Sequence, residues 1–325
     1  MSSSSLQARV HQMRHEAPGI LSVELRPLVP GTAFAQAVEP GAHIDLHLAE
    51  GLTRSYSLTN PGDRHRYVVA VALDPKSRGG SRFVHASLRV GQALSLSAPR
   101  NHFALHEDAT HSVLLAGGIG ITPLYAMLRR LAALQRRAHL IYCASRRDGA
   151  AFVAQIEALA AASAGRLTVD WQFRDERPAR AELQQLLADQ PEGTHFYCCG
   201  PLALVEGYEH ACEALGLTNV HQERFAAAPL PQARTPQEGY TVELRKCGRQ
   251  LQVAAGMSLL DALLDAGVNA DYSCREGVCG ACEVKVISGD VDHLDQILSK
   301  QEHAANRSMM VCVSGCRSGT LVLDL

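Results

Sequence analysis

The chain lacks any long uninterrupted apolar run. None of its 325 residues lies in a stretch near the ~18–20 apolar residues of a membrane span, and the N-terminus has no apolar core of a secretion signal. A strong charge of one sign is also missing, since 31 Lys and Arg stand against 33 Asp and Glu. Neither nucleic-acid nor membrane binding is therefore indicated. We expect a protein of the cytoplasm.

Internal repeats and low-complexity tracts are absent too. The composition, 46 % hydrophobic and 20 % charged, excludes a disordered chain, and the length predicts two or three domains. Ten cysteines are present, but a disulfide framework is not expected in a chain of this size without a secretory signal. Clustered thiols in a reducing compartment indicate a metal centre instead.

The hydrophobic pattern changes near residue 112. Before it, alternating strands separated by Pro-Gly pairs are typical of a small antiparallel β-barrel. After it, apolar strands alternate with helical stretches, which indicates an α/β domain with a parallel sheet. The predicted strands are 21–25, 43–48, 67–73, 93–97, 112–116, 138–143, 167–173 and 195–199, and the predicted helices are 124–134, 150–162, 181–187 and 202–215.

A break with three prolines follows at residues 226–238 and is typical of an interdomain linker. Beyond it, the pattern predicts a hairpin at 240–245 and 250–253, a helix at 259–266 and a cysteine-rich loop. The chain is therefore predicted to be multidomain. The predicted parts are the barrel at 1–106, the α/β domain at 107–228, the linker at 229–238 and a third domain at 239–325.

Four cysteines of the third domain form a pattern. Cys274, Cys279 and Cys282 have the spacing C-x4-C-x2-C, and Cys312 follows after 29 intervening residues. This spacing is typical of a plant-type [2Fe–2S] cluster held by four thiolates. We prefer Cys312 as the fourth ligand because it ends a strand-like stretch, with Cys316 as the alternative.

The loop between these cysteines supports the same reading. Gly277 and Gly280 let the backbone fold tightly around inorganic sulfurs, with amides free to hydrogen-bond them. A zinc site is the alternative, but zinc sites usually use C-x2-C twice over. The four-residue first gap and the distant fourth cysteine favour iron–sulfur.

Two segments of this domain, YSCREGVCGAC at 272–282 and MMVCVS at 309–314, resemble the ferredoxin domain of phthalate dioxygenase reductase and vanillate demethylase reductase. These proteins are flavin-containing partners of Rieske oxygenases. The similarity covers essentially the whole chain in the same domain order. It implies a β-grasp, α+β third domain and a terminal Rieske non-haem iron oxygenase as the partner. For such a shuttle we expect a monomer.

A flavin site is predicted at the end of a barrel strand. The residues there resemble the Arg-x-Tyr-Ser motif of ferredoxin-reductase-type flavin domains. Tyr56 can lie flat against the isoalloxazine ring, Arg54 can neutralise the flavin phosphate, and Ser57 can hydrogen-bond the N5 edge. An ordinary strand is the alternative. The predicted flavin-binding residues here are Arg54, Ser55, Tyr56 and Ser57.

A second segment, residues 78–82, supports the flavin. It precedes the helical stretch 83–88, which places Gly79, Gly80 and Ser81 at a helix N-terminus, a natural phosphate seat. The family resemblance implies FMN, whereas the residues alone leave FAD open.

A nucleotide site is predicted where the strand at 112–116 enters the next helix. Its glycines let the backbone approach a pyrophosphate at the positive helix end, with Thr122 as cap and Pro123 as first helical residue. A purely structural turn is the alternative, since the loop is not the dehydrogenase fingerprint. The predicted residues are Gly117, Gly118, Gly120, Thr122 and Pro123.

A second strand end, at 197–201, supports this site. By resemblance Cys199 lies near the nicotinamide, with Gly200 and Pro201 beside it, while Cys198 points to the opposite face of the strand and belongs to the core. The family also has an aromatic covering the flavin or nicotinamide at the position of Phe225. Plain packing is the alternative for Phe225.

The segment 145–148 after the second strand of the parallel sheet bears on the nucleotide. Ser145 and Arg146 are predicted to contact it; an arginine there suits a 2′-phosphate, whereas Asp148 suits a ribose hydroxyl. These residues do not decide between NADH and NADPH, and the family resemblance favours NADH.

These sites together predict an NADH-dependent reductase that passes a hydride to FMN and single electrons through the cluster to an oxygenase. A nicotinamide gives two electrons at once and a [2Fe–2S] cluster takes one, so a flavin is needed between them. Ser57, Cys199 and Phe225 are the residues placed nearest the hydride transfer. Two alternatives remain: a flavoreductase for a cytochrome or di-iron monooxygenase, and a non-catalytic zinc scaffold.

Overall fold

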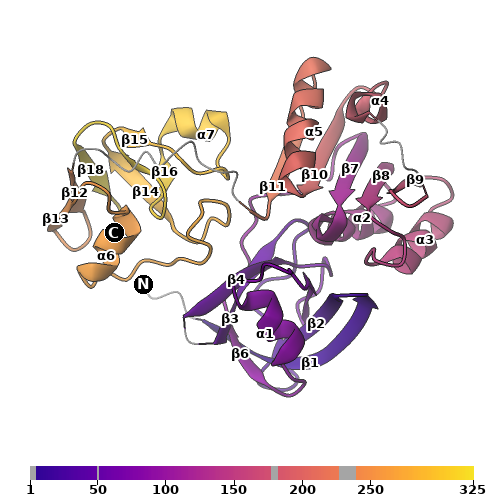
Figure 1. Ribbon diagram of the computed structural model, residues 1–325, viewed down its shortest axis with the longest axis horizontal. Coiled ribbons are helices and arrows are strands. Elements are labelled where there is room, and N and C mark those ends of the chain that lie inside the picture. The colour runs from indigo at the N-terminus through magenta and orange to yellow at the C-terminus, as the bar shows by residue number, and fades with distance from the viewer. Residues whose placement is uncertain (1–4, 50, 177–181, 227–238) are drawn as a thin grey trace. The chain divides into compact units, whose positions relative to one another are not determined.

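The structure, a computed structural model, describes residues 5–49, 51–176, 182–226 and 239–325. The chain divides into two compact units, with the division between Glu223 and Arg224. Figure 1 shows the first unit in indigo to red and the second in orange to yellow. Within the described residues no helix is both long and apolar enough to cross a membrane. The predicted linker at 229–238 lies outside the described residues.

Six antiparallel strands begin the first unit, in the spatial order β4-β3-β6-β1-β2-β5. A backbone bridge joins Leu58, just after β4, to Val69 of β5, so the two edge strands meet and the sheet curls into a barrel. The elements are β1 (Leu6–Ala17), β2 (Ile20–Pro27), β3 (His43–Ala49), β4 (Leu52–Ser57), β5 (Tyr67–Ala72), α1 (Gly80–Ala86) and β6 (Ala93–Leu96).

A five-stranded sheet in the order β11-β10-β7-β8-β9 completes the first unit. The pairs β10–β7, β7–β8 and β8–β9 are parallel, as the alternation of strands and helices predicts. The elements are β7 (His111–Gly117), η1 (Gly118–Gly120), α2 (Ile121–Ala133), β8 (Ala138–Ala144), α3 (Val153–Ala162), β9 (Leu167–Phe173), α4 (Leu183–Leu187), β10 (Thr194–Gly200), α5 (Leu202–Ala214) and β11 (Val220–Arg224).

Alternate residues of the central strand β7 face opposite layers of helices. Leu114 packs in one core cluster with α2 and α3, whereas Leu115 packs in another with α4 and α5. The same alternation separates Cys199, in the first cluster, from Cys198, in the second. Cys198 is fully buried, so its prediction as a core residue is confirmed.

The second unit contains a mixed sheet in the order β13-β12-β18-β14-β16, with β12 and β18 parallel, and a small pair β15–β17. Apolar residues of α6 pack with these strands in one core. The elements are β12 (Tyr240–Leu244), β13 (Arg249–Val253), α6 (Leu259–Asp265), β14 (Glu283–Ser288), β15 (Val291–Asp292), α7 (Lys300–Ala305), β16 (Ser308–Met310), β17 (Gly315–Cys316) and β18 (Thr320–Leu323).

The longest strand of the barrel, β1, was absent from the sequence prediction. Most of its residues are polar or charged, and only Ala8, Val10 and Ala17 are buried. Leu6, Ala8 and Val10 alternate with polar residues, but the alternation ends at the bulge between Val10 and Gln12, so only the first half of the strand carries this signal. Pairing with β2 and β6 on its two sides determines the strand instead.

Candidate functional site

The motif Arg54–Ser57 lies within β4 and forms its last four residues. Tyr56 and Arg54 are two residues apart and share one face of the strand. Burial raises the pKa of the Tyr56 phenol to about 12, although the Arg54 charge lowers it. The phenol is therefore neutral at physiological pH, and its half-buried ring is held against the barrel core.

Arg54 lies across the start of α1. Its Nη2 donates to the carbonyl oxygen of Arg78 and its Nη1 to that of Thr53, each at 2.7 Å. Gly80 makes room for this side chain, because a Cβ there would lie 2.5 Å from Arg54 Cγ. Gly79, just before the helix, has a φ of +98°, which favours glycine. The fold thus brings together two segments that the sequence predicts separately for one cofactor.

The hydroxyls of Ser55 and Ser81 are engaged within the barrel. Ser55 Oγ donates to Asp45 Oδ1 at 2.5 Å. Ser81 Oγ donates to Ser77 Oγ at 2.9 Å and accepts from the Asp74 peptide N–H at 3.1 Å. Because both hydroxyls have protein partners, the prediction that Ser55 and Ser81 bind the flavin now concerns their peptide groups, and it stays a prediction.

Ser57 meets residues of the parallel sheet around a buried carboxyl group. Glu223 of β11 is hydrogen-bonded to Ser57. Its Oε2 lies 4.0 Å from Cys199 Sγ, and its Oε1 lies 3.9 Å from Nδ1 of His43, the first residue of β3. Barrel and parallel sheet therefore build one site together, at the carboxyl ends of β10 and β11.

Burial governs the protonation of this site. It raises the pKa of the Glu223 carboxyl to about 8, against the lowering effect of the Ser57 hydrogen bond. Burial and the neighbouring Glu223 also raise the pKa of the Cys199 thiol well above its usual range. Cys199 is thus a neutral, fully buried thiol, unlike the exposed thiolates that act as nucleophiles.

Sequence reasoning missed two members of this group. His43 is the first residue of a predicted strand and carries no motif. Glu223 lies in β11, which was not among the predicted strands, and it carries no motif either. Phe225 itself is 42 % exposed and lies past the division between the two units, so its role over the flavin stays a prediction.

Three glycines interlock the ends of β7 and β10. A Cβ on Gly120 would lie 2.2 Å from the carbonyl oxygen of Cys199, and one on Gly117 would lie 2.7 Å from Pro201 Cδ. A Cβ on Gly200 would come within 2.9 Å of Gly117 Cα. The predicted loop 117–120 and the predicted segment 199–201 therefore lie in direct contact. Close packing explains these glycines, while Gly118, with φ +53° and open space around it, provides the turn.

The prediction that Thr122 caps α2 is wrong. The helix begins at Ile121 with Gly120 as its N-cap, because the turn η1 winds the chain before the helix starts. Thr122 is the second helical residue, and its Oγ1 donates to the Ile119 carbonyl oxygen at 3.0 Å. Pro123 is accordingly the third helical residue, where its missing N–H still needs no partner.

Ser145 and Arg146 follow β8 directly. Arg146 donates from Nε and Nη2 to the two carboxylate oxygens of Asp148, each at 3.0 Å, and both side chains are exposed. The cation that could bind a 2′-phosphate is therefore already paired.

The four predicted cluster cysteines converge. The peptide N–H of Cys274 points to Cys279 Sγ at 3.5 Å, and the Cys282 and Cys312 thiols are hydrogen-bonded to each other. The hydrogen bond from the Cys279 thiol, together with peptide N–H groups, lowers the pKa of Cys274 to about 6. Cys316 belongs to β17, where its thiol lies 3.5 Å from Ser318 Oγ.

The loop supplies what a thiolate cluster needs. Arg275, Gly277 and Gly280 all have positive φ, so the backbone wraps tightly around the four sulfurs. The Glu276 peptide N–H donates to Cys274 Sγ at 3.3 Å, the kind of bond that stabilises thiolate charge. Four sulfur donors with amide donors around them fit a [2Fe–2S] cluster.

Comparison with known proteins agrees with this geometry. Residues 242–317 match the model of a 2Fe-2S iron-sulfur cluster binding domain. Residues 96–221 match the N-terminal domain of the DmmA-like dimethylamine monooxygenase subunit. Phenoxybenzoate dioxygenase subunit beta of Ectopseudomonas oleovorans is 45 % identical and vanillate O-demethylase oxidoreductase of a Pseudomonas species is 39 % identical. Each alignment covers 98 % of this chain, and 96 % and 100 % of the two relatives.

Solved structures resemble the whole chain as well. Phthalate dioxygenase reductase is 32 % identical with a TM-score of 0.69, over 99 % of this chain and 98 % of that one. An intact type IV self-sufficient cytochrome P450 monooxygenase is 36 % identical with a TM-score of 0.89, and this chain spans 41 % of its length.

Fold, thiol cluster and relatives define an electron-transferring oxidoreductase. The chain belongs to the family of oxygenase reductase components that includes vanillate O-demethylase oxidoreductase and phthalate dioxygenase reductase. The family, the three-part fold class, the enzyme class and a set of cofactors of flavin, pyridine nucleotide and [2Fe–2S] type were all predicted, and these predictions are confirmed. An oxygenase partner follows from the family.

Proposed function

We propose that this chain takes a hydride from NADH onto FMN and passes single electrons through its [2Fe–2S] cluster to a Rieske non-haem iron oxygenase. The carrying observation is the convergence of Cys274, Cys279, Cys282 and Cys312 in a chain that also builds the shared site of Ser57, Cys199 and Glu223. When bound, FMN accepts an electron pair and releases it singly, which neither partner can do alone.

Arg54 is proposed to bind the FMN phosphate. Its guanidinium already lies at the start of α1, where the peptide N–H groups of Gly80 and Ser81 are available as further donors. Tyr56, on the same face of β4, is proposed to cover the isoalloxazine ring. This pairing of a cation and an aromatic ring on one strand face supports the flavin.

Ser57, Cys199 and Glu223 are proposed to line the place of hydride transfer. The Ser57 hydroxyl can hydrogen-bond the flavin edge, and the fully buried Cys199 presents a small neutral surface to the nicotinamide. The chain needs no nucleophile there. Orientation of the two rings and exclusion of water are the contributions expected from these side chains.

NADH is the proposed donor. Asp148 places a carboxylate near the predicted position of the ribose. Its bidentate pair with Arg146 neutralises the guanidinium that a 2′-phosphate would need. The interlocked glycines 117, 120 and 200 are proposed to present the pyrophosphate-binding backbone beside Cys199.

The domain boundaries 1–106, 107–228, 229–238 and 239–325, a monomeric state and a cytoplasmic location are parts of the same proposal. The side chain of Arg129 in α2 donates to the Thr59 carbonyl oxygen of the barrel at 2.9 Å, which supports treating the first two parts as one electron-input unit. Four cluster thiols fit a reducing compartment.

Anaerobic titration of the purified protein with NADH and with NADPH tests the proposal, followed by optical and EPR spectra. We expect NADH to bleach a flavin and a cluster together and to give the EPR signal of a reduced [2Fe–2S] centre. A protein without iron and acid-labile sulfide would refute it. The P450 relative favours a second candidate acceptor, a cytochrome, so purified Rieske and P450 partners should be compared as acceptors.

A further inference from the structure

A second group of possible metal ligands lies in the C-terminal unit, apart from the four cysteines. His293 and Asp295 follow β15, and His303 belongs to α7. One ligand atom of each residue lies within 4.8 Å of those of the other two. Asp295 stands between the histidines: its Oδ2 is 3.1 Å from His303 Nε2, and its Oδ1 is 3.5 Å from His293 Nδ1.

This group is buried. The side chain of Asp295 has no exposed surface, and that of His293 is 8 % exposed. Neither ring nitrogen of His293 has a hydrogen-bond partner among the described residues. A buried imidazole without a hydrogen-bond partner costs free energy, and a buried carboxylate gains from a nearby cation even where Leu298, Ser314 and His303 already bond to it. A bound cation would compensate both.

The carboxylate is held in place by the surrounding chain. The Leu298 peptide N–H donates to Asp295 Oδ2 at 3.0 Å, and Ser314 Oγ donates to Oδ1 at 3.4 Å. Oδ1 and Oδ2 of Asp295 therefore each accept one hydrogen bond that fixes the carboxylate. The second lone pair of each oxygen is directed at a histidine ring or at a metal ion. Such outer partners orient metal ligands in known sites.

The spacing of the three residues suits a small transition metal ion. Two ligand atoms that each lie about 2.0–2.1 Å from a tetrahedral Zn²⁺ are about 3.3 Å apart. The two carboxylate–imidazole distances, 3.1 Å to Oδ2 and 3.5 Å to Oδ1, are close to this separation, but they involve the two different oxygens of Asp295. The His293 and His303 rings stack with their centroids 4.4 Å apart, so one ring must turn before both can direct a nitrogen at the same ion.

We propose that His293, Asp295 and His303 bind one divalent transition metal ion, with Zn²⁺ as the preferred ion. Two imidazoles and a carboxylate are nitrogen and oxygen donors of intermediate softness, and Zn²⁺ binds such sets more tightly than Mn²⁺ or Fe²⁺. Three protein ligands leave the fourth position to water.

The site would connect α7 to the cluster loop. The Gln296 peptide N–H, next to Asp295, donates to the Gly277 carbonyl oxygen at 2.9 Å. Ser314 stands two residues after Cys312. An ion at this position joins the segment 293–295 directly to α7. Through the contacts of Gln296 and Ser314 it also restrains the loop 274–282 and the segment around Cys312. It stabilises the folded unit because it binds only there.

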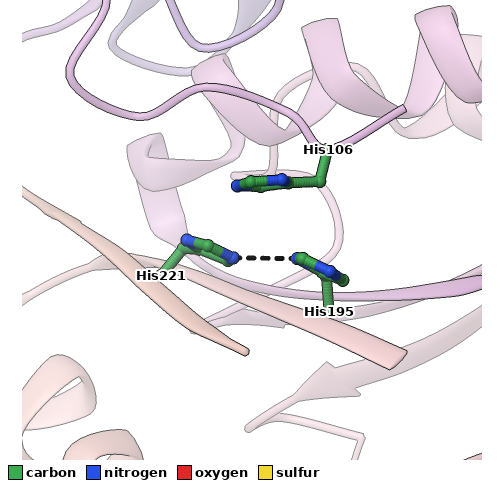
Figure 2. A group of neighbouring side chains, drawn as sticks. All are labelled: His106, His195 and His221. Carbon is green, nitrogen blue, oxygen red and sulfur yellow. Dashed lines mark hydrogen bonds between the residues drawn. The ribbon is translucent and has the colours of Figure 1, made fainter. Parts of the chain in front are cut away.

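A histidine group in the first unit serves as the internal control. His195 Nδ1 and His221 Nε2 share a hydrogen bond of 3.0 Å, and the ring of His106 stacks over both, as Figure 2 shows. Like the proposed group, it contains stacked rings and a hydrogen bond, but it has no carboxylate. Within the described part of the chain, this group of three histidines is nevertheless a second place that could capture zinc.

The test uses the intact protein with its flavin and cluster, treated with EDTA and then titrated with Zn²⁺ in calorimetry, with zinc and iron counted per chain. We compare wild type, His303→Ala and His106→Ala. We expect wild type and His106→Ala to bind one Zn²⁺ at a site that His303→Ala weakens by at least ~10–100-fold, since loss of even an outer partner costs that much. Zn²⁺ should also raise the melting temperature of wild type but not of His303→Ala.

Two results would overturn the proposal: wild type binds no zinc with iron unchanged, or His303→Ala binds it as tightly as wild type. His303 is 28 % exposed, so its loss leaves the core of the unit intact. If His303→Ala lacks the colour of the cluster, His303→Gln replaces it with the same expectation. Constant iron content excludes zinc that enters through vacated cysteines.

Discussion

Cys199 Sγ lies 4.0 Å from Glu223 Oε2, at the point where two neighbouring strands of the parallel sheet end beside the barrel. Cys199 is fully buried and the Glu223 side chain is 14 % exposed, and the removal from water favours the neutral form of each. The edge of the proposed hydride-transfer site is therefore uncharged at neutral pH and gains a negative charge only as the pH approaches 8.

Replacing Glu223 should change how stability depends on pH. The pKa of this carboxyl is about 8 in the folded chain against a usual 4.5, so the unfolded chain loses its proton first. Wild type must then lose stability as the pH rises from about 5 to 8. Glu223→Gln cannot ionise, and its melting temperature should exceed that of wild type by a margin that grows over this range, at ~2–4 °C per kcal/mol. The exposed Glu206→Gln should follow wild type; parallel curves for Glu223→Gln would contradict the burial argument.

Loss of Arg54 should empty the flavin site. A hydrogen bond to a charged group contributes ~1.5–3 kcal/mol, so Arg54→Ala should weaken FMN binding ~10–150-fold. Fluorescence of released flavin during dilution measures this. Arg82→Ala removes an exposed arginine of α1 and should retain the cofactor. Equal retention by both variants would place the phosphate elsewhere.

A methyl group at Gly120 should separate the two strand ends. Its Cβ would lie 2.2 Å from the Cys199 carbonyl oxygen, a backbone atom that cannot move aside alone. Overpacking costs ~1–3 kcal/mol, so Gly120→Ala should lower the melting temperature and raise the KM for NADH. Gly149→Ala meets its nearest atom at 3.7 Å and should behave as wild type in both measurements. An unchanged KM with a lowered melting temperature would leave Gly120 a packing role only.

Asp148→Ala should improve the use of NADPH. The substitution frees Arg146 from an exposed bidentate pair, and exposed pairs contribute ~0.2–1 kcal/mol, which corresponds to a ~1.4–5-fold gain in kcat/KM for NADPH. Steady-state kinetics with both nucleotides measures it. Glu157→Ala, which removes one of the two carboxylates paired with the neighbouring Arg147, is the control. A gain equal to that of the control would remove Arg146 from the nucleotide site.

Cys279→Ser and Cys312→Ser should abolish electron transfer to cytochrome c while NADH still reduces the flavin. Each removes one of four sulfurs that converge in the loop, whereas Cys316 lies in β17 beside Ser318. Cys316→Ser should therefore keep iron content and transfer. If Cys316→Ser loses the cluster and Cys312→Ser keeps it, the fourth ligand has been misassigned.

Local patterns carried most of the prediction. β9 at Leu167–Phe173 and the cluster cysteines were predictable because an apolar strand and a ligand spacing are encoded in adjacent residues. β1 was missed, because the alternation of its residues ends at the bulge after Val10 and pairing with β2 determines the rest of the strand. The cap at Thr122 failed because a helix can begin on a preceding turn, as η1 shows.

The residues of the candidate site also fall into those that a local motif predicts and those that only the fold brings together. Arg54 and Gly80 each belong to a short motif, but their contact depends on how β4 meets α1. His43 and Glu223, like Asp295 and His303, are ordinary residues in sequence, and only the folded chain brings each pair together. Tertiary proximity of this kind leaves no linear signal.

The placement of β18 has a consequence for synthesis on the ribosome. This strand is made after every other strand of its unit, yet it lies in the middle of the sheet, between β12 and β14. Until Leu323 has left the exit tunnel, β12 and β14 each expose a row of unpaired peptide groups. A chain that lacks β18 cannot close this sheet, and its exposed strand edges are expected to make it a target for proteolysis.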